Sequence, residues 1–132
     1  MMLVDTNILV DIVEDDPEWS NWSIAQLRSQ SQVYELAINP IIYTELSITF
    51  SRLETLDKVI DQLGLKFLEI PRAALFLAAK AFVQYRQAGG VKSNVLPDFF
   101  VGAHAAVAST SLLTRDPRRY RTYFPGVRLV TP

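Results

Sequence analysis

A chain of 132 residues is long enough to bury the core of one domain, and we expect residues 1–132 to form that single domain. With 49% hydrophobic and 20% charged residues the composition excludes long disordered segments, and 13 basic against 14 acidic side chains give a net charge of -1 that leaves nucleic-acid contacts to local patches. The lack of cysteine excludes disulfides, thiolate metal sites and a cysteine nucleophile, and it fits the cytoplasm.

Short β-like runs alternate with helical stretches along the chain, which predicts an α/β domain with a mainly parallel sheet. Strands are expected at residues 2–4, 34–38, 66–70, 112–114 and 127–130. Helices are expected from residues 5–7 to 13, over 18–30, over 39–53 continuing at 57–63, over 71–88 and over 99–109. Residues 91–96 are predicted to form a loop and 115–117 a turn.

Apolar side chains at helical spacing predict which helix faces are buried. One predicted stripe comprises Tyr43, Leu46, Phe50 and Leu53, and another comprises Leu75, Ala78, Ala79, Phe82 and Val83. The small residues of the alanine-rich stretch 99–109 indicate that this helix packs closely against a neighbour.

Four acidic residues fall at strand ends or near helix starts. Asp5 directly follows the first strand, and Asp116 follows the fourth. Asp98 lies at a helix N-terminus, and Glu45 lies one to two turns into the helix after the second strand. In an open parallel sheet, ligands bind beyond the carboxyl ends of the strands, where the strand order reverses. If the first and fourth strands are neighbours, these side chains converge on that edge.

Clustered carboxylates require a counter-charge. Two such charges about 4 Å apart repel each other by roughly 4 kcal/mol at an effective dielectric constant of about 20. Hard oxygen ligands suit Mg²⁺ or Mn²⁺, and such an ion also binds phosphate, orients a phosphodiester and activates water. The pattern therefore favours hydrolytic phosphoryl transfer without a protein nucleophile.

Each acidic residue also has a purely structural interpretation. Asp5 and Asp98 are typical helix caps. Asp116 stands before a proline, as turn residues do, and Glu45 by itself could be a solvated helix residue. Phosphatases and phosphoacceptor receiver domains also place aspartates and Mg²⁺ at strand ends. They are disfavoured because Asp5 begins no D-x-D motif and no lysine follows the late strands, and no P-loop pattern indicates an NTPase.

Four blocks of sequence each carry one of these acidic residues. They are LVDTNILVD at 3–11, NPIIYTEL at 39–46, PDFFVGAHA at 97–105 and LLTRDPRRY at 112–120. In order and spacing they resemble the PIN-domain family, and in particular the VapC toxins of toxin–antitoxin pairs. The resemblance implies that the four acidic residues are catalytic and hold the metal ion. By number these residues are Asp5, Glu45, Asp98 and Asp116.

The resemblance also implies a fold, an activity and partners. The fold is a PIN-like three-layer sandwich in which helices flank a central, mainly parallel sheet of about five strands. The activity is that of a Mg²⁺- or Mn²⁺-dependent endoribonuclease acting on tRNA, rRNA or mRNA. The partners are a second copy in a homodimer and a cognate antitoxin whose tail fills the active-site groove. The alternative is a non-catalytic PIN-like scaffold that binds RNA or protein, and metal binding separates the two.

Two further residues, Asn7 and Thr114, match family positions that hydrogen-bond the metal ligands or their waters. Some family members carry another acidic residue three positions after the one matching Asp116, where this chain has Arg119. We therefore expect one firmly held metal ion before the substrate binds.

Arginines crowd the last part of the sequence, together with Tyr120 and Tyr123. They indicate either a phosphate-binding patch with aromatic stacking or a solvated surface with partly buried tyrosines. An arginine there could instead pair with an acidic group of an antitoxin. The candidates for RNA binding are Arg115, Arg118, Arg119 and Arg121, with Arg128 nearby.

The remaining candidates are weaker. His104, the one histidine, is expected to be a packed helix residue rather than a general base, and Asp11 is a weak site candidate. Trp19 and Trp22 belong either to the core or to a partner surface. The opening MMLVDTN does not resemble a signal peptide, and no apolar run approaches the roughly 20 residues that span a bilayer, so no membrane contact is expected.

Overall fold

The computed structural model describes residues 1–92 and 94–132, and in this part of the chain it contains a five-stranded sheet. Its strands are β1 (Met2–Val4), β2 (Leu36–Ile38), β3 (Lys66–Phe67), β4 (Ser111–Leu113) and β5 (Leu129–Val130). Their order is β3-β2-β1-β4-β5, and every neighbouring pair is parallel. The predicted α/β fold with a parallel sheet of five strands is confirmed.

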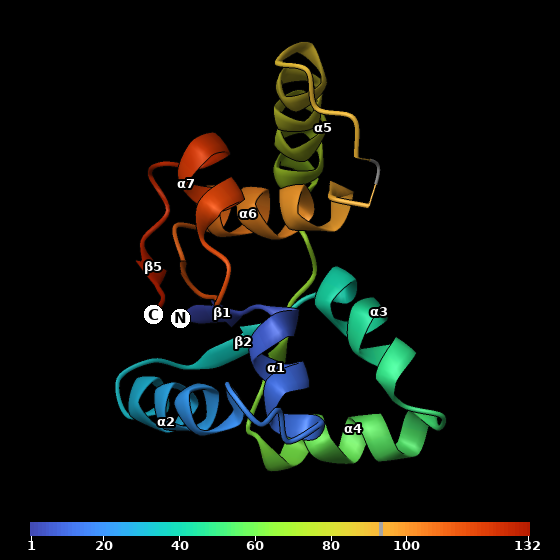
Figure 1. Ribbon diagram of the computed structural model, residues 1–132, viewed down its shortest axis with the longest axis vertical. Helices are drawn as coiled ribbons and strands as arrows, with labels where there is room; N and C mark the ends of the chain where they lie inside the picture. Colours follow the sequence, from blue (N-terminus) through green and yellow to red (C-terminus); the bar gives the residue numbers. More distant parts are fainter. Residues whose placement is uncertain (93) are drawn as a thin grey trace.

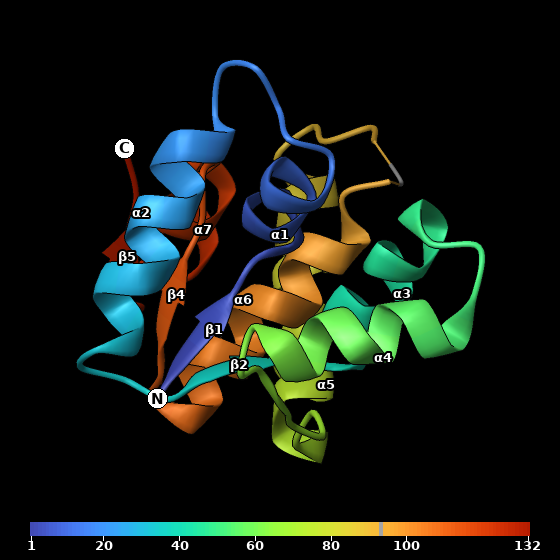
Figure 2. The same cartoon turned by 90° about the horizontal axis from the view of Figure 1, so that it is seen from below.

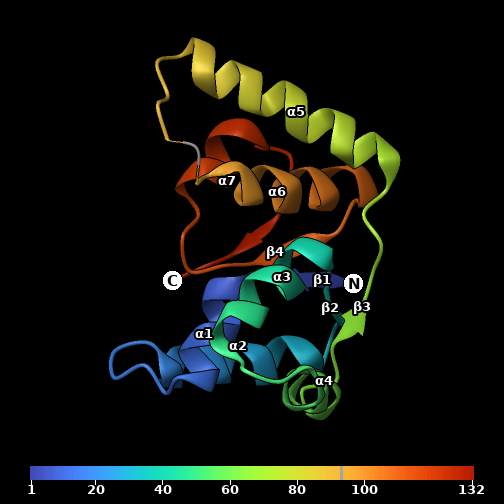
Figure 3. The same cartoon turned by 90° about the vertical axis from the view of Figure 1, so that its right-hand side faces the viewer.

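Helices flank this sheet. They are α1 (Thr6–Val13), α2 (Ser20–Ser31), α3 (Pro40–Thr49), α4 (Leu53–Gln62), α5 (Arg72–Gln87), α6 (Leu96–Ala108) and α7 (Arg118–Tyr123). Figure 1 shows α5, α6 and α7 on one side of the sheet and α1, α2 and α4 on the other, and Figures 2 and 3 show the same layers from below and from the side. Helix α3 joins the layers, because it contacts both α1 and α6.

The strand order reverses at β1, which pairs with β2 on one side and with β4 on the other. Val4 lies opposite Leu113 in the ladder, and the backbone N–H of Asp5 donates to the Leu113 carbonyl at 2.9 Å. The segments that follow β1 and β4 therefore leave the sheet side by side. All residues of β1 and β2 are buried, because helices cover both faces of the sheet, and this is why the two strands read as continuous apolar runs.

Polar side chains at the strand–helix junctions start the helices that follow. Asp5 Oδ1 accepts the N–H of Thr6 at 2.8 Å and caps α1. Asn39 Oδ1 accepts two N–H groups of the first turn of α3, at 3.1 and 3.0 Å, and Pro40 occupies the first helical position. Each junction therefore fixes where a helix begins relative to the carboxyl edge of the sheet.

The helical stretch predicted over 39–63 is two helices rather than one. Helix α3 ends at Thr49, and three residues separate it from α4. Leu53, which was expected in the buried stripe, opens α4 and is 61% exposed. The buried residues of α4 are Leu56 and Ile60, one turn apart, because the break gives α4 an inward face of its own. The predicted stop at Gly64 is confirmed, and its φ of 69° is a left-handed conformation that favours glycine.

The predicted stripe of α5 is wrong in part. Leu75, Ala79 and Val83 are exposed, whereas Phe82 is half-buried. The buried residues of this helix are Ala74, Ala78 and Ala81. These small side chains pack against the alanine-rich α6, and α5 and α6 form the most extensive helix–helix contact of the described residues. The close packing predicted for 99–109 is confirmed.

The remaining differences concern the ends of elements. Strand β1 has the predicted bounds and β4 is shifted by one residue, whereas the other three strands are shorter than predicted, with β3 covering 66–67 instead of 66–70. Helix α6 begins at Leu96, inside the predicted loop 91–96, of which Ser93 lies outside the described residues. Helix α7 is absent from the prediction, because its sequence RRYRTY has no apolar periodicity. In the described part of the chain, no helix combines the length and apolar character needed to cross a membrane.

Candidate active site

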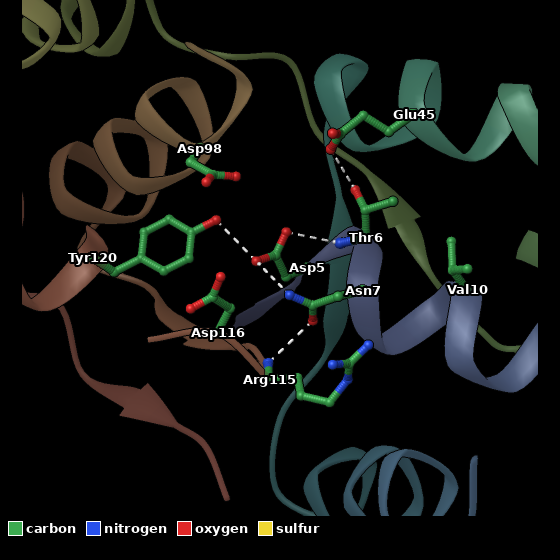
Figure 4. A pocket seen from close by; sticks show the side chains of 9 residues that line it. All are labelled: Asp5, Thr6, Asn7, Val10, Glu45, Asp98, Arg115, Asp116 and Tyr120. Atoms are coloured by element: carbon green, nitrogen blue, oxygen red, sulfur yellow. Dashed lines mark hydrogen bonds between the residues drawn. The ribbon is translucent and has the colours of Figure 1, made fainter. Parts of the chain in front are cut away.

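A pocket of about 330 Å³ opens beyond the carboxyl ends of β1 and β4 (Figure 4). All four acidic residues singled out in the sequence line it, each from a different segment. Asp5 caps α1, Glu45 lies on α3, Asp98 lies in the first turn of α6, and Asp116 follows β4. The other lining residues are Thr6, Asn7, Val10, Arg115 and Tyr120. We call this the carboxylate pocket.

Asp5 is the most buried acidic residue of the pocket, with 5% of its surface exposed. Its Oδ2 accepts hydrogen bonds from the hydroxyls of Thr114 at 2.8 Å and Tyr120 at 2.9 Å, and from Nδ2 of Asn7 at 3.5 Å. Together with the cap on Thr6 at Oδ1, these donors hold both carboxylate oxygens. The position of Asp5 is therefore fixed from α1, from the residue that directly follows β4 and from α7.

Burial makes the ionised form of Asp5 costly. It raises the pKa of Asp5 from 3.8 to about 6, and the negative charge of Asp98 adds to this increase. The hydrogen bonds from Thr114, Tyr120 and Thr6 act in the opposite direction, because they stabilise the carboxylate. Since burial and the charge of Asp98 outweigh the hydrogen bonds, the surroundings of Asp5 favour its protonated form more than water does.

Glu45 is held from the start of α1, where the hydroxyl of Thr6 donates to Oε1 of Glu45 at 2.7 Å (Figure 4). The pKa of Glu45 is raised, mainly by burial and further by the charge of Asp98, while the hydrogen bond from Thr6 lowers it. None of the ion pairs among the described residues includes Glu45. The residue is thus not the freely solvated helix position that its place in the sequence allowed.

Asp98 differs from the other pocket carboxylates in having an ion-pair partner. Nη1 of Arg119 lies 2.6 Å from Oδ2 of Asp98. The pKa of Asp98 is nevertheless raised, because burial outweighs the hydrogen bond and the charge of Arg119. The N-cap of α6 is Val95, so the interpretation of Asp98 as a helix cap is wrong.

Asp116 is exposed at the rim, and the loop that carries it is tied to α1. Its N–H donates to the Thr114 hydroxyl at 3.2 Å, and the N–H of Arg115 donates to Oδ1 of Asn7 at 3.1 Å. Nδ2 of Asn7 also donates to the Thr114 hydroxyl at 3.3 Å. The structure thus places Asn7 and Thr114 between Asp5 and the Asp116 loop, where they orient both.

The carboxylate oxygens in the pocket are the kind of ligand that Mg²⁺ or Mn²⁺ prefers. In the positions that the structure gives the described residues, no three acidic or histidine side chains converge on one point that could hold a metal ion. The pKa values of Asp5, Glu45 and Asp98 are raised first by burial, which makes each carboxylate costly to ionise, and a divalent cation would relieve this cost. The residues therefore fit such an ion by their chemistry, and side-chain rotation is needed for joint ligation.

Arg115, a candidate for RNA binding, is half-buried and paired with Asp11. Its Nε and Nη2 donate to the two carboxylate oxygens of Asp11 at 2.8 and 2.9 Å, and its guanidinium lies 5.1 Å from the Trp19 ring centroid. The Ser23 hydroxyl donates to the same carboxylate at 2.8 Å. Asp11 is 2% exposed, so this ion pair joins α1 and α2 to the Asp116 loop. Sequence reasoning missed this role of Asp11, because nothing in the sequence pairs it with a residue 104 positions away.

The sequence left open whether Tyr120 stacks among the arginines or is partly buried, and the structure buries it against Asp5. Burial and the charge of Asp5 raise the pKa of Tyr120 well above its usual value, so its hydroxyl remains a donor. His104 is 2% exposed, and burial lowers its pKa. Its Nδ1 accepts from Nδ2 of Asn39 at 3.1 Å, because the Oδ1 of Asn39 is already used as the α3 cap. His104 is thus confirmed as a packed residue, which links the helices of Glu45 and Asp98.

The other aromatic and basic candidates lie outside the carboxylate pocket. Trp19 and Trp22 are half-buried and meet edge to face at 6.1 Å. Arg128 is directed to Tyr34, whose hydroxyl accepts from Nη1 at 3.2 Å. Arg118 and Arg121 are exposed on α7.

Comparison with known proteins identifies the family of this fold. The sequence profile of the PIN domain matches residues 2–125. Among solved structures, VapBC2 from Rickettsia felis bound to a promoter DNA fragment is similar at 18% identity, with a TM-score of 0.76 over 99% of this chain and 98% of that chain. DNA-bound VapBC from Salmonella typhimurium gives 18% identity and a TM-score of 0.72 over 98% and 96% of the two chains. VapBC-1 from nontypeable Haemophilus influenzae gives 16% identity and a TM-score of 0.74, over 98% of this chain and 96% of that chain.

These identities are low, so the solved structures show a shared fold and do not by themselves assign an activity. No curated protein sequence matches the chain.

Proposed function

This chain belongs to the PIN domain family, and on that premise we propose that residues 1–132 act as a single nuclease domain, a metal-dependent endoribonuclease that is the toxin of a toxin–antitoxin pair. One observation carries the proposal. Carboxylates from four segments that are far apart in the sequence line one pocket at the carboxyl edge of the sheet. Caps and turns needed only for folding have no reason to share one pocket, whereas a site for a divalent cation and a phosphodiester requires such a set.

Asp5, Glu45, Asp98 and Asp116 would hold Mg²⁺ or Mn²⁺. The ion, when bound, would supply Lewis-acid activation of water and of the phosphodiester. The chain's own residues prepare the site for it. The Thr114 and Tyr120 hydroxyls orient Asp5, and the Thr6 hydroxyl orients Glu45.

Arg119 supports the expectation of a single firmly held ion. It occupies the sequence position where some family members carry another acidic residue, and its guanidinium neutralises part of the charge on Asp98. A cation built into the protein at that point reduces the need for a second metal ion. Competition between Arg119 and the metal ion for Asp98 is also expected.

The partners follow from the kind of protein that the fold resembles. The similar solved structures are toxin–antitoxin complexes, which supports a cognate antitoxin as the partner of this chain. We further propose a homodimer acting on cytoplasmic tRNA, rRNA or mRNA. Light scattering on the purified chain tests the dimer, and co-purification with the product of a neighbouring gene tests the antitoxin.

The alternative is a PIN-like scaffold that binds RNA or protein without cleaving it. Among the described residues no three acidic side chains converge on one point, and this observation favours the scaffold hypothesis over a metal site that is fully formed before the ion binds. Calorimetric titration with Mn²⁺ separates the two, because a scaffold has no need to bind the ion. Binding in the wild-type protein that is lost in Asp5→Asn supports the nuclease.

Cleavage of a mixed panel of tRNA and single-stranded RNA, in Mn²⁺, Mg²⁺ or EDTA, tests the proposed activity. The wild-type protein is expected to cut in either metal and not in EDTA. Asp5→Asn is expected to remove the activity, whereas Asp61→Asn, on the exposed side of α4, keeps it. Equal cutting by wild type and Asp5→Asn, or cutting that persists in EDTA, would contradict the proposal.

A further inference from the structure

A second pocket, of about 360 Å³, adjoins the carboxylate pocket and shares Asp116 with it. Its walls include Tyr85, Lys92, Asp116, Arg118, Arg119 and Thr122. We call it the cationic pocket, because three of these side chains are positively charged and one is negatively charged. The carboxylate pocket has the opposite balance, with four acidic residues and one arginine. A ligand that extends across Asp116 therefore meets both signs of charge.

Two of the three cations that line this pocket, Lys92 and Arg118, are available to a ligand. Lys92 and Arg118 are exposed and take part in none of the ion pairs among the described residues. Arg119 lines the same pocket while its Nη1 contacts Asp98 in the other one. Lys92 and Arg118 thus differ from two other cations of the chain. Arg115 is bound to Asp11, and Arg128 is directed to Tyr34.

The floor of the cationic pocket is fixed by aromatic packing. The Tyr85 and Tyr123 rings meet at 6.2 Å, and both contact Phe99 in the core of α6. The Tyr85 hydroxyl accepts the backbone N–H of Lys92 at 3.1 Å, and the guanidinium of Arg119 lies 5.9 Å from the Tyr85 ring centroid. The Tyr85 hydroxyl thus holds the segment that carries Lys92, and its own O–H remains able to donate to a ligand.

We propose that the cationic pocket binds a phosphate group of single-stranded RNA, next to the phosphodiester presented to the carboxylate pocket. The inference rests on the proposed nuclease function and specifies how its substrate is held. Lys92 and Arg118 supply the charge, and the Tyr85 hydroxyl supplies a further donor. An acidic peptide would also satisfy the cations, but a continuous strand explains why the pocket shares a wall with the carboxylates.

The opposite charges of the two adjoining pockets also suit them to different roles. The carboxylate pocket by itself repels a polyanion when no metal ion is bound, so affinity for RNA must come from elsewhere on the surface. Lys92 and Arg118 are the described cations that line the adjoining pocket without an ion-pair partner. Arg121 lies on the same helix as Arg118 but lines neither pocket, so we assign it no role here.

Binding of a short fluorescein-labelled single-stranded RNA, measured by anisotropy in EDTA over a range of KCl concentrations, tests the inference without any cleavage. Lys92→Ala and Arg118→Ala are each expected to weaken binding about 3- to 10-fold and to reduce the salt dependence, the slope of log K against log[KCl], by about 0.7. The matched control is Arg28→Ala, which removes an exposed arginine of α2 on the other side of the sheet. Wild-type affinity and slope in both pocket variants would overturn the proposal.

An RNA cleavage assay and an acidic-peptide binding assay separate this inference from the proposed nuclease function. If the wild-type protein cuts no RNA in Mn²⁺ but its RNA affinity still depends on Lys92 and Arg118, the cationic pocket stands and the nuclease fails. If the protein cuts RNA and the two variants bind it normally, only the pocket fails. An oligoglutamate peptide serves as the acidic-protein probe, and its binding through Lys92 and Arg118 in the absence of RNA binding would also overturn the proposal.

Discussion

The carboxylate pocket and the cationic pocket share Asp116 but are built in opposite ways. The carboxylate pocket lies where β1 and β4 end, and its central residue, Asp5, is buried and held by donors from three elements. The cationic pocket lies farther out, and its charges, Lys92 and Arg118, are exposed ends of flexible side chains. Under the proposed function, the chemistry that needs fixed geometry would take place at the end of the sheet, and the attraction that needs only charge would act at the periphery.

Arg119 connects the two pockets. Its guanidinium contacts Asp98 on one side and the Tyr85 ring on the other. Arg115, only four positions earlier, also pairs with an aspartate, but Asp11 lies beneath the site and outside both pockets. Of two similar ion pairs, one therefore stabilises the scaffold, and the other engages a carboxylate that the proposed metal ion would need. The predictions below test whether the two pockets are separable.

The largest expected effect separates catalysis from RNA binding. Asp98→Asn removes a carboxylate from the metal site and is expected to lower cleavage at least about 1000-fold, because several kcal/mol of metal-dependent stabilisation are lost. The same change frees Arg119 and removes a negative charge beside the cationic pocket. RNA affinity in EDTA is therefore expected to rise about threefold. Cleavage assays and anisotropy measure the two effects.

Asp61→Asn is the control for this variant, because it makes the same chemical change at an exposed site on α4. A parallel loss of cleavage and RNA affinity in Asp98→Asn would contradict the separation of the two pockets.

Asp5 is expected to destabilise the metal-free protein at neutral pH. Its pKa is raised from 3.8 to about 6, so between these values the folded state holds a proton that the unfolded state has lost. As the pH rises through this range, the folded state must give up the proton and the free energy of unfolding falls. Above about pH 6 the full loss applies, and the difference between the two pKa values corresponds to about 3 kcal/mol. Asp5→Asn avoids the cost and is expected to be more stable than wild type in EDTA.

Urea unfolding in EDTA at about pH 4 and about pH 8 checks this expectation. The stability gain of Asp5→Asn should be large at the higher pH and small at the lower one. An equal gain at both pH values would show that the buried charge is not its cause.

Thr114 is expected to act on the metal ion through Asp5. Thr114→Val removes the hydroxyl that donates to Asp5 and accepts from the backbone of Asp116. Residues that orient metal ligands typically contribute about 10- to 100-fold to affinity, and we expect a loss of that size in Mn²⁺ titrations. Thr114→Ser keeps the hydroxyl and is expected to bind Mn²⁺ like wild type. Unchanged affinity in Thr114→Val would remove Thr114 from the site.

Arg119 gives the smallest effect but the sharpest signature, because the two pockets should respond in opposite directions. Arg119→Ala releases Asp98 and is expected to tighten Mn²⁺ binding about threefold, while RNA binding weakens about threefold. Arg119→Lys keeps the charge and should change RNA affinity less. Changes of the same sign in both titrations would argue against an arginine shared between the pockets.

The sequence predicted the parallel sheet, and it singled out four acidic residues that line one pocket, for identifiable reasons. β1 and β2 are short apolar runs that end at a polar helix cap, Asp5 or Asn39, and such junctions are visible in any single sequence. Glu45, Asp98 and Asp116 were recognised by spacing and by resemblance, and the structure places them in one pocket. Local signals of this kind survive folding because they act over a few residues.

The sequence did not predict how the side chains around these positions pair. Asp11 with Arg115 and Tyr120 with Asp5 join residues more than a hundred positions apart, and Arg119 meets Asp98 only because α6 and α7 pack together. The exposed Leu75 and Val83 on α5 were misassigned for a related reason, since the alanine face packs against α6.

The amino-acid sequence by itself thus determined the order of the five strands along the chain and of most helices, α7 excepted, because this order depends on short-range patterns. The same patterns singled out the acidic residues at the carboxyl edge. Tertiary structure alone decided which arginines are consumed by internal ion pairs and which line a pocket. Charge pairing depends on distance in space, and that distance exists only once α6, α7 and the two central strands have packed against one another.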